Sequence, residues 1–249
     1  TVSRVTLVYP YFRTKAASKL FPPLGIASLT SQLRAFGVQA DQYDCTFKSF
    51  EQAVAEIAGQ RPSIVGIYAM VTMRKTAIRL LRSLRRLLPD ACFITGGPLP
   101  TLYPETFARE FDLVFRGEAD LAFPSFCRDY LDLAEQRDFK TSLDLSKYPG
   151  LFLADGSVTI QTPAVNLSSS ALDGLPLPDR TGVDHASYQS FWTSKMGSKT
   201  ATLMVTRGCP HHCDFCSKPI FGNVFRKRSI GRVMEEIEHI ASWGYDHLW

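Results

Sequence analysis

The chain has 249 residues, of which 45% are hydrophobic, so it can bury a sizeable core as one large or two small domains. Its 28 basic and 24 acidic residues give a net charge of +4, an excess too small to indicate a nucleic-acid or membrane partner. The sequence has no secretory-signal pattern and no run of roughly 18 apolar residues, so it predicts a cytoplasmic protein without a transmembrane segment.

Short apolar runs alternate with amphipathic segments over the first half of the chain. The runs predict five strands, Val5–Tyr9, Val38–Tyr43, Ile64–Tyr68, Cys92–Thr95 and Leu113–Phe115. The segments between and after them predict helices, Leu24–Phe36, Phe50–Ala58, Thr72–Leu88, a short helix after Pro104, and Phe123–Leu133. This alternation predicts an α/β, doubly wound, flavodoxin-like fold that binds ligands at the carboxyl ends of its strands.

The pattern changes after about residue 135. Asp155-Gly156 predicts a β-hairpin and Leu175–Pro178 an extended stretch, so we interpret 136–198 as a linker. From 199 to 249 the sequence predicts a strand at Ala201–Thr206, a cysteine loop, and a helix that begins after an N-cap at Ser229. We expect this last part to be the truncated start of a barrel, because a complete barrel needs about 150 to 200 further residues.

Small residues follow two of the predicted strands directly. Gly96-Gly97-Pro98 and Arg116-Gly117-Glu118 lie where a ligand can approach free backbone amides, although tight turns are also routine at these positions. The sequence contains no Gly-x-Gly-x-x-Gly, which disfavours a dinucleotide.

Three of the six cysteines, Cys209, Cys213 and Cys216, crowd into eight positions. Such spacing in a reducing compartment indicates metal, and three thiolates on a four-iron cubane leave one iron open for a substrate or cofactor. A zinc site completed by His211 or His212 is the competing interpretation. The other cysteines, Cys45, Cys92 and Cys127, are predicted to lie in the core.

Arg207-Gly208-Cys209-x3-Cys213-x-Phe215-Cys216 resembles the signature of the radical S-adenosylmethionine (SAM) superfamily. The resemblance implies that the three cysteines hold a [4Fe-4S] cluster, that the open iron binds SAM, and that Phe215 lies near the adenine. The family's Gly-Gly-Glu segment would lie beyond Trp249.

The first 135 residues resemble the cobalamin-binding domain that precedes the barrel in one subfamily, with Phe21–Gly25 and the two turn motifs in matching order. The resemblance implies that three loops surround the corrin, namely Met70, Val71 and Thr72; Gly96, Gly97 and Pro98; and Gly117 and Glu118. All five histidines lie at or after His185, so none in this domain can ligate cobalt.

The combined resemblance implies a cobalamin-dependent radical SAM enzyme that methylates an unactivated carbon of an unidentified small molecule or peptide. An electron donor such as flavodoxin or ferredoxin would reduce the cluster. Two alternatives remain open at this point: an oxidative cyclase or rearrangement enzyme similar to anaerobic tetrapyrrole cyclases, and a non-catalytic cobalamin-binding or zinc module.

Overall fold

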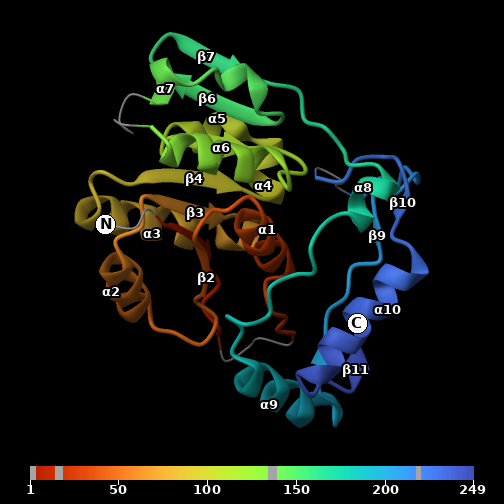
Figure 1. Cartoon of the computed structure of the whole chain (residues 1–249). Coiled ribbons are helices and arrows are strands. Elements are labelled where there is room, and N and C mark those ends of the chain that lie inside the picture. The colour runs from red at the N-terminus through yellow and green to blue at the C-terminus, as the bar shows by residue number, and fades with distance from the viewer. Residues whose placement is uncertain (1–3, 15–18, 134–138, 217–219) are drawn as a thin grey trace.

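A seven-stranded sheet forms the centre of the molecule (Figure 1). The computed structural model describes residues 4–14, 19–133, 139–216 and 220–249. The strands of this sheet are β1 (Val5–Tyr9), β2 (Ala40–Asp44), β3 (Ile64–Tyr68), β4 (Cys92–Gly96), β5 (Leu113–Phe115), β6 (Leu151–Asp155) and β7 (Val158–Gln161). The helices of the same part are α1 (Leu24–Ala35), α2 (Phe50–Gln60), α3 (Arg74–Leu87), α4 (Pro98–Leu102), α5 (Pro104–Ala108), α6 (Ala122–Leu131) and α7 (Phe139–Ser142), with 3-10 turns at Val71–Met73 and Leu145–Lys147.

The strands lie in the order β2-β1-β3-β4-β5-β6-β7. The first five are parallel, and β6 and β7 run antiparallel at one edge. The order 2-1-3-4-5 is that of flavodoxin-like folds, so the predicted doubly wound sheet is confirmed.

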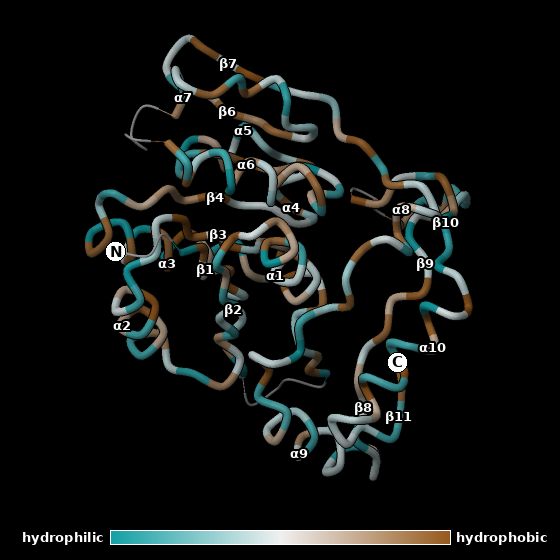
Figure 2. Tube along the Cα trace, viewed as in Figure 1, coloured by the Kyte–Doolittle hydropathy of each residue, from teal (hydrophilic) through white to brown (hydrophobic). Residues whose placement is uncertain are grey.

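Helices cover both faces of the sheet, and each face has its own hydrophobic core. Leu33 of α1 and Phe126 of α6 pack on one face. Ile57 of α2, Leu80 of α3 and Phe107 of α5 pack on the other. In Figure 2 the central strands are coloured as hydrophobic where they lie between these helices.

The predicted hairpin is present as β6 and β7, but it does not stand apart from the first domain. Phe152 of β6 pairs with Val114 of β5, so the segment interpreted as linker adds two strands to the sheet. Asp155 pairs with Val158, which places the turn at Gly156 and Ser157, one residue later than predicted. The predicted boundary at 135 lies outside the described residues, and the domain limits remain predictions.

The rest of the chain wraps one side of the sheet. It contains α8 (Ser169–Asp173), α9 (His185–Met196), β8 (Thr200–Ala201), β9 (Thr206–Arg207), β10 (Arg226–Lys227), α10 (Ile230–Ser242) and β11 (His247–Leu248). The prediction of one strand over Ala201–Thr206 is wrong: β8 pairs with β11 in parallel, β9 pairs with β10 in antiparallel fashion, and no ladder joins them.

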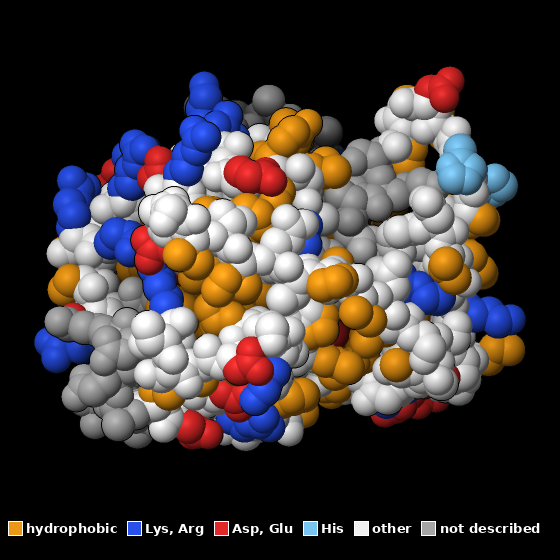
Figure 3. All heavy atoms as spheres, turned by 90° about the horizontal axis from the view of Figure 1, so that it is seen from above, with side chains coloured by type: hydrophobic (Ala, Val, Ile, Leu, Met, Phe, Trp, Pro, Cys, Tyr) orange, Lys and Arg blue, Asp and Glu red, His pale blue; other side chains and the backbone are white. Residues whose placement is uncertain are grey.

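Charged side chains on the face shown in Figure 3 are mixed, with acidic groups between the lysines and arginines. The basic residues of α3 fit this pattern. Arg82 bonds to Glu110 and Arg85 to Asp112, each at 3.1 Å, while the apolar residues of the helix, such as Leu81, are buried. The basic residues of α3 therefore form a solvated helix face, as the alternation of charges and apolar residues predicts.

Candidate functional site

A cavity opens on the α1 and α6 face of the sheet, beside the carboxyl ends of the central strands. Leu7, Gly66, Ile94, Phe115 and Phe123 form part of an apolar floor. One wall is α1, which contributes Gly25, Ser28, Leu29 and Gln32, and the linker roofs it with Leu172, Leu175, Pro176 and Pro178. An apolar slot with a few polar groups is the usual form of a small-molecule or cofactor site.

The structure brings part of the predicted cobalamin contacts to this cavity. Gly96, Gly97, Gly117 and Glu118 border it. The remaining four, Met70, Val71, Thr72 and Pro98, are absent from its lining, with Val71 exposed in the turn before α3 and Pro98 opening α4.

The backbone itself requires a glycine at position 97. Its φ of +108° lies in the region that favours glycine, and a Cβ there would come within 2.7 Å of the Ala69 carbonyl oxygen. The glycine therefore allows β3 and β4 to end in close contact at the edge of the cavity.

The cysteine loop connects β9 to β10 and is held at its base by backbone geometry. Gly208 has a φ of +78°, and a Cβ at this position would collide with the Val224 carbonyl oxygen. The amide of Cys209 donates to the Gly222 carbonyl at 3.2 Å, which ties the two sides of the loop together. The sequence predicted a loop here, and glycine is what lets its two sides approach.

Within the loop the predicted cluster ligands are accessible. Cys209 is half-buried, Cys213 and Cys216 are exposed, and Phe215 is 94% exposed. The Cys216 amide donates to the Cys213 carbonyl at 3.0 Å, which makes the second half of the motif a tight turn. Accessible thiols suit thiolate ligation of an iron-sulfur cluster by their chemistry.

The loop does not hold its thiols around a single metal ion. Over the described residues, no three cysteine, histidine, aspartate or glutamate side chains are placed to bind one metal ion. This applies to a zinc site completed by His211 or His212, whereas in a [4Fe-4S] cluster each cysteine binds a different iron, so the three thiols need not meet at one ion. The donor chemistry of these three thiols fits a cluster.

The remaining cysteines behave as core residues, as predicted. Cys45, Cys92 and Cys127 are buried. Burial raises the pKa of the Cys92 and Cys127 thiols well above its usual value, so both stay protonated. A buried neutral thiol is a poor metal ligand.

Four charged side chains connect the cysteine loop to the sheet. Arg207 donates from Nη1 and Nη2 to the two carboxylate oxygens of Asp120, at 2.8 and 3.0 Å, and from Nη1 to Glu118 at 3.1 Å. Arg226 forms an ion pair with the other oxygen of Glu118. Burial alone would lower the pKa of Arg207, but Asp120 and Glu118 raise it, so the guanidinium remains charged.

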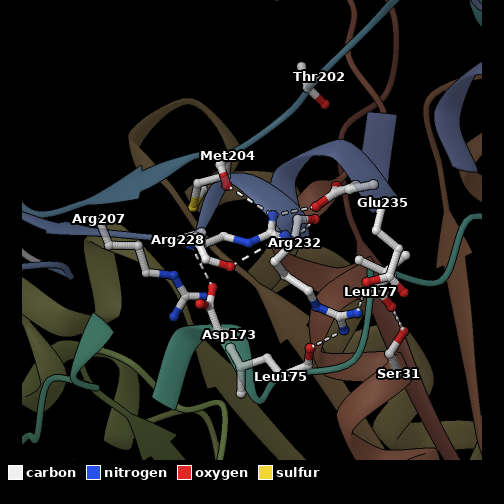
Figure 4. A network of polar contacts seen from close by, with 12 residues as sticks. Ser31, Asp173, Leu175, Leu177, Thr202, Met204, Arg207, Arg228, Arg232 and Glu235 are labelled. Carbon is white, nitrogen blue, oxygen red and sulfur yellow. Dashed lines mark hydrogen bonds and ion pairs between the residues drawn. The ribbon is translucent and has the colours of Figure 1, made fainter. Parts of the chain in front are cut away.

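A second buried charge cluster joins α10 to the linker and to the interrupted strand (Figure 4). Glu236 accepts from Arg180 at 3.0 Å and pairs with Arg228. Arg180 also donates to the Thr202 carbonyl and Arg228 to the Met204 carbonyl, at 2.9 and 3.2 Å. Guanidinium groups therefore bond carbonyls that a neighbouring strand would otherwise bond, which explains the gap between β8 and β9.

Sequence reasoning missed five of these charged residues as parts of the site, namely Asp120, Arg180, Arg226, Arg228 and Glu236, and it noted Arg207 only as part of the cysteine motif. One signal was available for Glu236. It lies three residues after Val233 and four before Ile240, on the apolar face of the predicted helix, where a carboxylate needs a buried partner.

Comparison with known proteins identifies the first domain. Residues 14–126 match the B12 binding domain family. This part of the chain is thus similar to the B12 binding domain family, as its sequence predicts. The chain is 29% identical over 250 residues to an uncharacterized methyltransferase of Pyrococcus horikoshii, an alignment that covers 95% of this chain and 50% of that protein.

Two further relatives have different names. Identity is 27% over 248 residues with an anaerobic magnesium-protoporphyrin IX monomethyl ester cyclase of Rubrivivax gelatinosus, covering 94% of this chain and 42% of the cyclase. It is 23% over 242 residues with a hopanoid C-3 methylase of Methylococcus capsulatus, covering 94% and 43%. The chain thus spans about half the length, or less, of these relatives.

The fold is shared with a solved structure, that of the apo, selenomethionine-labelled cobalamin-dependent SAM radical enzyme OxsB. The TM-score is 0.72 at 18% sequence identity, and the match covers 98% of this chain and 32% of the other. In the part of the chain that the structure describes, no helix is long and apolar enough to cross a membrane.

Proposed function

We propose that this chain is the cofactor-carrying part of a radical SAM enzyme that uses cobalamin to methylate an unactivated carbon. One observation supports this most directly: Arg207, two residues before Cys209, is bonded to Glu118 and Asp120 beyond the end of β5. The loop with the three thiols therefore lies against the same strand ends that border the cavity. A cluster and a cobalamin held at these places would act on one substrate.

Cobalamin is assigned to the cavity. The apolar floor suits the flat aromatic base at the lower end of the cofactor, and Gly96 and Gly117 at its edge leave room for a large ring. All five histidines lie at or after His185, so none from the first domain would ligate the cobalt.

Cys209, Cys213 and Cys216 would hold the [4Fe-4S] cluster, and Phe215 would lie against the adenine of SAM. When bound, these groups supply a carbon radical and a methyl donor. The protein's own part is to orient the cofactors through the loop and the cavity and to exclude water, for which the apolar floor is suited. We place the enzyme in the cytoplasm, with an electron donor such as flavodoxin or ferredoxin and a small-molecule or peptide substrate.

The metal content of the intact protein tests this assignment. We expect about four irons and one cobalt per chain after purification without oxygen from cells supplied with cobalamin. Zinc without iron would contradict the proposal and support a zinc-stabilised module. Cobalt without iron would support a cobalamin-binding module without radical chemistry.

A second candidate is supported by the relatives named as cyclases, which match this chain over as much of its length as the methylases do. Product mass distinguishes the two. A product heavier than its substrate by one methylene unit supports methylation, whereas a product without that gain supports cyclisation or rearrangement.

A further inference from the structure

We propose that Glu118 is a positioning residue that fixes the cysteine loop against the cobalamin-binding edge of the sheet, and that its side chain does not contact cobalamin. The inference rests on the proposed function, since it concerns how the two cofactor sites are held together. It also reinterprets a residue whose sequence motif indicated a corrin contact.

The first argument is the position of its partners in the chain. Arg207 and Arg226 lie on either side of the cysteine loop, and they are directly paired across β9 and β10. Glu118 receives Arg207 on one carboxylate oxygen and Arg226 on the other. A single carboxylate from the first domain thus holds both ends of the loop.

The second argument is burial. Residue Glu118 is 6% exposed, but its side chain is 0% exposed, so only its backbone reaches the surface beside the cavity. The side chains of Arg226, Asp120 and Arg207 are 6%, 8% and 11% exposed. Two negative and two positive charges are buried together, and removal of one would leave an uncompensated charge.

The third argument is that the same group orders neighbouring backbone. Arg226 donates to the carbonyls of Phe221 and Leu167, each at 2.7 Å, and Glu118 accepts from the Leu167 amide at 3.3 Å. The ion pair of Glu118 and Arg226 therefore bonds both the returning side of the loop and the linker. Loss of the Glu118 charge would loosen the loop at both ends.

The test compares E118Q with E236Q in the intact protein, purified without oxygen from cells supplied with cobalamin. Glu236 is a matched control because it is also a buried carboxylate with two arginine partners, but it joins α10 to the linker. Hydrogen exchange over residues 207–226 is followed by mass spectrometry, together with iron and cobalt content.

We expect E118Q to accelerate exchange over 207–226 by about tenfold or more while it keeps its cobalt. E236Q should leave exchange in that segment within about twofold of the wild type. Unchanged exchange in E118Q would overturn the proposal. Loss of cobalt with unchanged exchange would overturn it too, because it would make Glu118 a cofactor contact.

A second variant covers the case in which E118Q does not fold. R207K keeps the charge but loses the two-donor fork on Asp120, so we expect the same acceleration to a smaller extent, and unchanged exchange would again contradict the proposal. Exchange can be measured whether or not metal is bound. A wild-type protein without iron would therefore refute the proposed function while still testing the role of Glu118.

Discussion

His185 at the start of α9 stacks on Trp243 at the end of α10, with ring centroids 4.2 Å apart and planes inclined by 15°. Its Nε2 lies 2.8 Å from the Arg180 carbonyl oxygen and its Nδ1 lies 2.9 Å from the Tyr245 hydroxyl. A carbonyl only accepts, so the neutral ring donates from Nε2 and accepts at Nδ1. The neutral form is fully bonded, and burial lowers the pKa of His185 below its usual value of 6.5.

This arrangement predicts that the free energy of unfolding rises with pH over one interval. The interval begins at the pKa of His185 in the folded protein, which lies below 6.5, and ends at about 6.5. In that interval the unfolded chain binds more protons at His185 than the folded protein does, so stability increases with pH. Urea unfolding at a series of pH values checks it. H185Q should flatten the profile, whereas H212Q, at an exposed position, should follow the wild type; identical profiles for H185Q and wild type would refute the prediction.

The buried cluster of Glu236, Arg180 and Arg228 predicts unequal effects of substitution. E236A leaves two buried arginines without their carboxylate and should cost about 3 to 5 kcal/mol of unfolding free energy. R180M should cost less, about 1 to 3 kcal/mol, because Arg228 still neutralises Glu236. Denaturant titration of both variants measures the difference, and a larger loss for R180M would contradict this account.

The sheet could be predicted from the sequence because its strands are short, buried and separated by clear turns. Val5–Tyr9 and Ile64–Tyr68 form strands at the predicted residues. The gap after Ala201 could not be predicted, since the carbonyls of Thr202 and Met204 are bonded by arginines distant in sequence. Local pattern contains no information about such partners.

The candidate site could be predicted where it depends on residue type and spacing, and not where it depends on long-range charge pairs. The thiols of Cys209, Cys213 and Cys216 are recognisable from spacing alone. The contact of Arg207 with Asp120 joins residues 87 positions apart, and it exists only once β5 and β9 have been placed together by the fold.

The cysteine assignment predicts that C213A loses iron and turnover. Removing one of three thiolates leaves two ligands, which do not hold a cubane firmly. C127A is the matched control, because Cys127 is buried in α6 and its loss should cost only about 1 kcal/mol of stability with iron unchanged. Iron analysis and product detection measure both, and full iron content in C213A would refute the assignment.

The cavity predicts that G25W weakens cobalamin binding. Gly25 borders the cavity in the first turn of α1, and a Cβ there meets no atom within 4 Å, so the backbone has room for an indole at the edge of the cavity. Gly59 in α2 is equally open but does not border the cavity, which makes G59W the matched control. Titration of the intact protein with hydroxocobalamin, followed by absorption, should give a Kd raised about tenfold or more for G25W and unchanged for G59W. Equal affinities in the two variants would mean that cobalamin binds elsewhere on the protein.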